Sequence, residues 1–376
     1  STMTSTEEKI IVVSWAGDDD PENPKNWTNT QKWIVTGLIS TSMMLSHMSS
    51  SMIAPAARDV AKDLGSTSPI FEPLLTSVFI LAYGKAEPTT WNFLSAFLYF
   101  VSIAHVLGRS RVVQLANVFY IVFNLLCAFA KDPNTMWLCR FFAGIGASCA
   151  AGSASVGLLL AIVGAPRGPS RGVALLAIPS LLGPVIGPIV GAWLVMNTTW
   201  KWIFWLTSIA AVFDQVGSFF WLKENTSRVI SRIYPKYTIR WHSRLSLILC
   251  PTSPSLTHMI LLLHPVFLLL TEPMIQLLGI YIGRLSDFLT VILTSIPDIF
   301  VVVYHESLGI AGLHYIAFGI GLYGGAQIAD ATQNELYRCL SARYGTTGRP
   351  EYRILIILPA TLLVTIGLLI TGTSQS

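Results

Sequence analysis

Ionisable side chains interrupt several long apolar stretches of this sequence. Arg140 begins the stretch RFFAGIGASCA, His47 lies among serines in LSHMSSSM, and Asp214 is followed by Gln215 in AAVFDQVG. Charged or titratable groups are costly inside a membrane, so they are functional candidates by default. Histidine titrates near neutral pH and could relay protons, whereas arginine stays protonated and could tune an acidic neighbour. Arg140, Asp214 and His47 are therefore candidates for proton coupling.

Each of these residues also has a plainer interpretation. Arg140, at the start of an apolar stretch, could extend its guanidinium to the lipid headgroups, and His47 could be a hydrogen-bonded polar side chain. Arg284 and Asp287 lie three residues apart in another apolar stretch. If that stretch is helical they share one face, so they can neutralise each other as an intramembrane ion pair.

Composition places the chain in the membrane class. Hydrophobic residues make up 52% of it and charged residues 12%, and the mean hydropathy is +0.59, whereas a soluble domain carries about 25% charged residues. The net charge of +4 is spread along the chain and does not indicate nucleic-acid binding. Five cysteines without a CxxC pair indicate no metal site. Phosphate-loop, HExxH and GxSxG motifs are absent from the sequence, so we expect neither a cofactor nor an enzyme.

Apolar stretches of about 20 residues predict an all-α multi-pass membrane protein with nine crossings. Lys and Arg cluster after the second, fourth, sixth and eighth crossings, which favours a cytosolic amino terminus. The expected crossings are 33–54, one between 70 and 107, 112–130, 136–163, 173–195, 202–222, 272–296, 310–331 and 354–370. The expected domains are a cytosolic tail (1–32), a six-helix bundle (33–222), a cytosolic linker (223–258) and an incomplete second bundle of about three helices (259–376).

The fifth crossing contains the run LLGPVIGPIVGAWL. Gly183, Gly187 and Gly191 recur every four residues and therefore share one helix face, where another backbone can approach closely. Pro184 and Pro188 lie in the same helix, which is tolerated in membranes because neighbouring helices re-satisfy the freed backbone groups.

This run resembles the Gly-Pro-x-x-Gly-Pro antiporter motif on the fifth span of drug:proton antiporters of the major facilitator superfamily. The segments DPENPKNW, RFFAGIGAS, TTWKWIFW and YHESLGIAGLHY also resemble fungal multidrug and secondary-metabolite exporters. The resemblance implies two helix bundles around a central cavity and proton-coupled export of amphipathic organic compounds. It implies a role for Arg140 in proton coupling. The implied partners are the lipid bilayer, an organic substrate and protons, without an obligate protein partner, most naturally in the plasma membrane.

The sequence also departs from that pattern. Gly108, Arg109 and Arg111 resemble the end of the family's cytoplasmic loop motif, but the acid that precedes it there is missing. We hypothesise that residues 84–106 derive from an unspliced intron or a gene-model error. Family members carry three more spans, so the resemblance implies a truncated, partly altered member with about nine of twelve helices. A non-transporting protein of the same ancestry and a polyamine exporter remain alternatives.

Overall fold

The computed structural model describes residues 26–66, 68, 70–83, 109–151, 170–222, 271–344, 363 and 366–367. Within these ranges the secondary structure is helical. The described helices are α1 (Asn29–Ser51), η2 (Ala54–Ala56), α2 (Ala57–Asp63), α3 (Phe71–Tyr83), α5 (Arg109–Ala128), α6 (Pro133–Ala151), α8 (Ser170–Asn197), α9 (Lys201–Trp221), α12 (Pro273–Pro297), η3 (Asp298–Val303) and α13 (Leu308–Tyr344). The hypothesis about residues 84–106, the linker at 223–258 and Gly108 lie outside the described residues.

The chain forms two compact units, Ser1–Tyr315 and Ile316–Ser376. The first contains all the described helices up to η3 and the start of α13. The described part of the second contains the rest of α13 and single helical positions near residue 366. Since α13 continues to Tyr344, it is longer than the crossing expected at 310–331; residues 332–344 contain Ala, Gln, Glu, Leu and Arg, which favour helix beyond the apolar stretch.

Several helices have the length and composition of membrane spans. In the described part of the chain, four helical stretches qualify, and two shorter apolar helices accompany them. The four are Ser110–Ala128, Lys201–Trp221, Gly279–Val303 and Leu308–Arg343, and the shorter two are Phe71–Tyr83 and Leu181–Asn197. The helix α1 is less apolar because it carries a row of polar side chains, but these are buried against its neighbours. The prediction of an all-helical membrane protein is confirmed.

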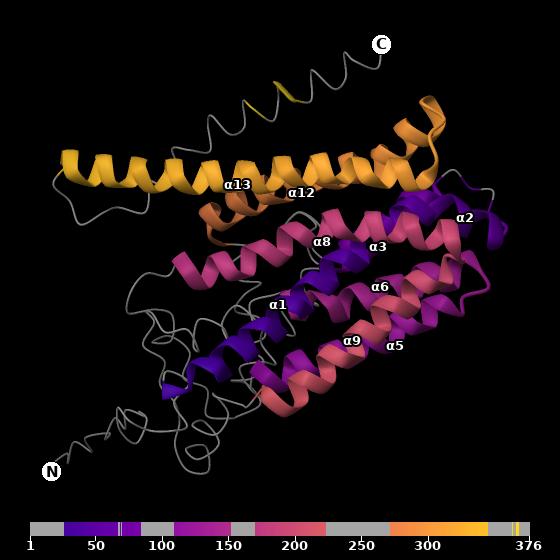
Figure 1. Cartoon of the computed structure of the whole chain (residues 1–376), viewed down its shortest axis with the longest axis horizontal. Helices are drawn as coiled ribbons and strands as arrows, with labels where there is room; N and C mark the ends of the chain where they lie inside the picture. The colour runs from indigo at the N-terminus through magenta and orange to yellow at the C-terminus, as the bar shows by residue number, and fades with distance from the viewer. Residues whose placement is uncertain are drawn as a thin grey trace, which may run out of the picture. The chain divides into compact units, whose positions relative to one another are not determined.

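The helices of the first unit pack side by side (Figure 1). The helix α1 contacts α8, α9 and α6, while α5 contacts α6 and α9, and α3 contacts α6. One buried core includes Met52, Phe71 and Phe204. On the outer face of α9, Phe213 is 74% exposed and Phe219 is 70% exposed. Large apolar side chains on such a surface are suited to contact with lipid tails.

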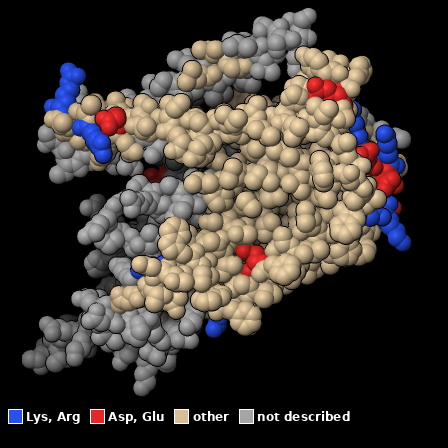
Figure 2. Space-filling model, in the orientation of Figure 1, with Lys and Arg blue, Asp and Glu red and all other residues tan. Residues whose placement is uncertain are grey.

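Charge is distributed in keeping with a membrane environment. On the face seen in Figure 2, charged side chains gather at the end of the first unit where α2 lies, and uncharged residues cover most of the surface over α8 and α9. The helix α8 remains continuous although Pro179, Pro184 and Pro188 lie inside it. The helix α12 is followed by the π-helix η3, and π-helical turns are frequently found at functional sites.

Candidate functional site

The glycine face of α8 lies directly against α1. A Cβ atom added to Gly183 would lie 2.5 Å from the Cβ of His47, and one added to Gly187 would lie 2.5 Å from the Ser51 hydroxyl. A Cβ on Gly191 would overlap the carbonyl oxygen of Met52. Contacts this short leave no room for a side chain, so the close approach expected from the glycine spacing is confirmed, and α1 is the helix that makes it.

Asp214 lies inside the first unit, on α9. Asp214 is 5% exposed, and it is the one buried acidic residue among the side chains whose burial the structure describes. The hydroxyl of Ser42 on α1 donates a hydrogen bond to Oδ2, while Oδ1 has no hydrogen-bond partner among the described residues. A buried acid with so little compensation is poorly stabilised as an anion, so this position is suited to gaining and losing a proton.

Arg140 is buried on α6. Arg140 is 1% exposed, which rules out the interpretation that its guanidinium extends to the lipid headgroups. Nη1 donates to the carbonyl oxygen of Ser49 at 3.0 Å, and Nε donates to that of Leu75 at 3.4 Å. The guanidinium carbon lies 4.6 Å from the centroid of the Phe79 ring and 5.7 Å from that of Phe204. Carbonyl dipoles and aromatic faces therefore surround a fixed positive charge.

A set of polar side chains connects α5 with α9. The Asn117 amide donates to Gln215 Oε1 at 2.9 Å, and Gln114 donates to the carbonyl oxygen of Ser218 at 3.2 Å. The amide of Asn124 donates to the hydroxyl of Ser208, which also lies on α9, at 2.9 Å. We call this set of contacts the polar ladder. The sequence reasoning missed it, although Gln114, Asn117 and Asn124 recur at helical spacing within an apolar span, which predicts one polar face.

The other expected site residues are placed as follows. His47 is buried on α1, with Nδ1 2.8 Å from the carbonyl oxygen of Met43, and its ring lies edge-on to Tyr83 with centroids 5.5 Å apart. Arg109 begins α5, and Arg111, two residues later in that helix, is exposed. Two further residues, Arg284 and Asp287, are both exposed on α12, and their ion pair stays a prediction.

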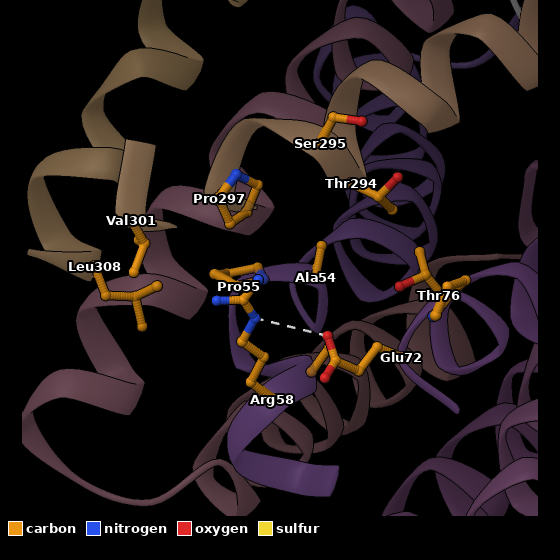
Figure 3. Close-up of a pocket in the computed structure, with 12 residues that line it drawn as sticks. Ala54, Pro55, Arg58, Glu72, Thr76, Thr294, Ser295, Pro297, Val301 and Leu308 are labelled. Atoms are coloured by element: carbon orange, nitrogen blue, oxygen red, sulfur yellow. Dashed lines mark ion pairs between the residues drawn. The ribbon is translucent and has the colours of Figure 1, made fainter. Parts of the chain in front are cut away.

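A cavity of about 280 Å³ lies between the early helices and α12 (Figure 3). Arg58 and Glu72 form an ion pair on its wall, with Nε and Oε2 3.7 Å apart. The hydroxyls of Thr76, Thr294 and Ser295 supply further polar groups. The remaining lining is apolar: Ala54, Pro55, Ala57, Pro73, Pro297, Val301 and Leu308. Within the described ranges, no cluster of His, Cys, Asp and Glu could hold a metal ion.

Comparison with known proteins agrees with this architecture. A family model described as the Major Facilitator Superfamily matches residues 39–376. Efflux pump vrtL of Penicillium aethiopicum is 35% identical over 96% of this chain and 70% of its own length. An uncharacterized transporter of Schizosaccharomyces pombe is 32% identical, covering 97% and 73%, and the MFS-type transporter penM of Penicillium rubens is 30% identical, covering 97% and 71%.

The family model spans most of the chain, and the similar proteins align along nearly all of it. Their names describe transporters and efflux pumps rather than enzymes. With its apolar helices and buried polar interior, this chain belongs to the Major Facilitator Superfamily and is a multi-pass membrane transporter of that family.

Proposed function

We propose that the protein is a proton-coupled antiporter that exports amphipathic organic compounds, such as drugs, toxins or a secondary metabolite, from a fungal cell. The observation that carries the proposal is the buried carboxyl group of Asp214, which has one hydroxyl donor and a second oxygen without a partner among the described residues. The efflux pumps to which the chain is similar support the direction of transport.

Proton coupling follows from the charges inside the first unit. Arg140 keeps its positive charge at any physiological pH, so a proton on Asp214 changes the net charge of the buried interior by one. An arrangement of helices that accommodates the neutral acid differs in free energy from one that accommodates the anion. Proton exchange can therefore shift the equilibrium between two conformations, and alternating access of this family is such an equilibrium.

The substrate class is inferred from the cavity in Figure 3. Prolines and aliphatic side chains line most of it, and Arg58, Glu72 and three hydroxyls supply a few polar groups. Pockets of this mixture favour compounds with a large apolar body and a small number of polar groups. An amphipathic organic molecule fits this description better than a highly charged metabolite.

The orientation is part of the proposal. We place the amino terminus in the cytosol, because basic residues follow alternate spans. We place the protein in the plasma membrane, as the resemblance to drug:proton antiporters implies. In that orientation α1 runs outward and the cavity lies toward the outer side, where an exported compound leaves. Arg284 and Asp287 on α12 are proposed to pair with each other and so lower the cost of two charges in a membrane helix.

The test uses the full chain reconstituted in lipid vesicles with an acidic interior, with rhodamine 6G as the probe. We expect the probe to accumulate in these vesicles, because protons leave as the probe enters. Asp214→Asn should abolish gradient-driven accumulation while exchange of labelled for unlabelled probe continues. The matched control is Glu335→Gln, another acid-to-amide change, because the Glu335 side chain is 70% exposed and bonds to Arg338 on the surface.

Two results contradict the proposal. If the wild-type protein transports the probe equally with and without the pH gradient, transport is not coupled to protons. If Asp214→Asn keeps both the accumulation and the pH profile of the wild type, Asp214 is not the coupling residue. Protein-free vesicles measure passive entry of the probe.

A further inference from the structure

We propose that Asn124 is a positioning residue that connects the surroundings of Arg140 to α9, the helix that carries Asp214. This inference rests on the proposed antiport and extends it, because it identifies how two buried charged groups in different helices influence each other. Asn124 lies on α5, is 0% exposed, and contacts both α1 and α9.

Toward α9, the amide nitrogen of Asn124 has three acceptors. It lies 2.9 Å from the Thr207 hydroxyl, 2.9 Å from the Ser208 hydroxyl and 3.3 Å from the carbonyl oxygen of Phe204. An amide group has two hydrogens to donate, so these acceptors use its full capacity. Asn124 is therefore fixed to one turn of α9.

Toward α1, the contacts lead to Arg140. The hydroxyl of Ser49 donates to Oδ1 of Asn124 at 3.5 Å, and the hydroxyl of Tyr120 donates to Ser49 Oγ at 2.8 Å. The backbone carbonyl of the same Ser49 accepts the hydrogen bond from Arg140 Nη1 at 3.0 Å. The side chain of Ser49 thus bonds to α5 while its carbonyl bonds to the guanidinium.

The helices α1 and α9 are consequently connected at two levels. Asp214 bonds to Ser42 at one level, and Asn124 connects Ser49 to Ser208 at the other. The levels are separated by seven residues on α1 and six on α9, or about 10 Å along each helix axis. A change in the charge of Asp214 alters its hydrogen bond to Ser42 and can displace α9 along α1. Because Asn124 bonds to both helices, this displacement also moves Ser49. The carbonyl of Ser49 accepts the hydrogen bond of Arg140, so the position of that bond changes as well.

The first experiment measures gradient-driven accumulation and gradient-independent exchange of rhodamine 6G in vesicles. Asn124→Leu should lower accumulation about tenfold, within the usual range for coupling between sites, while exchange stays within about twofold of wild type. Ser49→Ala, which keeps the carbonyl and removes the hydroxyl, should give the same pattern. The matched control is Asn117→Leu, since Asn117 bonds to Gln215 alone in the described contacts; it should lower both rates in parallel.

The second experiment does not depend on transport. Arg140→Gln and Asp214→Asn are combined in a double-mutant cycle, and thermal unfolding is measured in detergent. In the wild-type background, the change in Tm of the double variant should differ from the sum of the changes caused by Arg140→Gln and Asp214→Asn alone. When Asn124→Leu is also present, the two changes should add. If the leucine variant does not fold, Asn124→Ala is measured in its place.

The outcomes separate this inference from the proposed function. Equal loss of both transport rates in the Asn124 and Asn117 variants, or non-additivity that persists without Asn124, overturns the inference. A wild-type protein without gradient-driven accumulation contradicts the antiport, and the unfolding cycle still decides whether Asn124 couples the two sites.

Discussion

The α1–α8 contact and the α5–α9 contact hold neighbouring helices together in different ways. Between α1 and α8, glycines bring two backbones so close that no side chain fits between them. Between α5 and α9, amide and hydroxyl side chains connect the two helices with hydrogen bonds. Without a hydrophobic driving force between helices in lipid, close packing and polar contacts are the two main ways to hold a membrane bundle together.

The difference predicts how each contact responds to change. The contact between α1 and α8 depends on glycines that have no side chain. Any larger residue there would clash with the backbone of the facing helix. The polar ladder depends on paired groups, so removing one member leaves the other unsatisfied, whereas removing both costs less. Substitutions in the two contacts should therefore differ in how much stability they remove.

The largest effect is expected for Gly191→Leu. A side chain at this position overlaps the carbonyl oxygen of Met52, so we expect a cost at the upper end of the usual range for overpacking, about 3 kcal/mol. Thermal unfolding of the purified variant in detergent measures the loss. Gly37→Ala is the control, because nothing lies within 4 Å of a Cβ added there. Equal stability of Gly191→Leu and wild type would show that the helices can separate without cost.

A smaller effect is expected for Asn117→Leu. This change leaves the partly buried Gln215 Oε1 without its donor. A fully buried unsatisfied group costs about 1–3 kcal/mol, so we expect a loss near the lower end of that range. Adding Gln215→Leu should recover most of the loss, since two apolar groups then face each other. Chemical unfolding of both single variants and the double variant measures the coupling. Strictly additive losses would contradict the description of the ladder as paired groups.

Tyr120→Phe removes one hydroxyl. The hydrogen bond to Ser49 at 2.8 Å is lost, but the ring keeps its place in the apolar core. Buried hydrogen bonds between membrane helices contribute about 0.6 kcal/mol on average, and we expect a loss of that size in thermal unfolding. A loss as large as that of Gly191→Leu would mean that the hydroxyl has a greater role than this single bond.

The smallest effect is expected for Gln114→Ala. Its bond to the Ser218 carbonyl lies at the partly exposed end of the ladder, where water or headgroups can replace it. The change in unfolding free energy should stay below about 0.5 kcal/mol. If this variant is as unstable as Asn117→Leu, the contribution of a hydrogen bond to the free energy of unfolding does not depend on its position along the polar ladder.

Much of the fold could be predicted from the sequence, because apolar length and glycine spacing are local properties. The helix positions and the close face of α8 follow from them. The partner of that face could not be predicted, because His47, Ser51 and Met52 lie more than a hundred residues earlier in the chain. The burial of Arg140 could not be predicted either. The sequence placed it near the start of the crossing expected at 136–163, where an arginine can extend outward or turn inward, whereas in the structure it lies well inside α6 (Pro133–Ala151).

The buried serines of α1 have a consequence for the order in which the protein is made. Ser42 finds its partner Asp214 172 positions later in the chain, and Ser49 reaches Asn124 75 positions later. At ribosomal rates of about 5–20 residues per second, α1 waits on the order of 10–35 s for the carboxylate. During biogenesis the polar face of α1 therefore lacks these two partners until α5 and α9 have been synthesised.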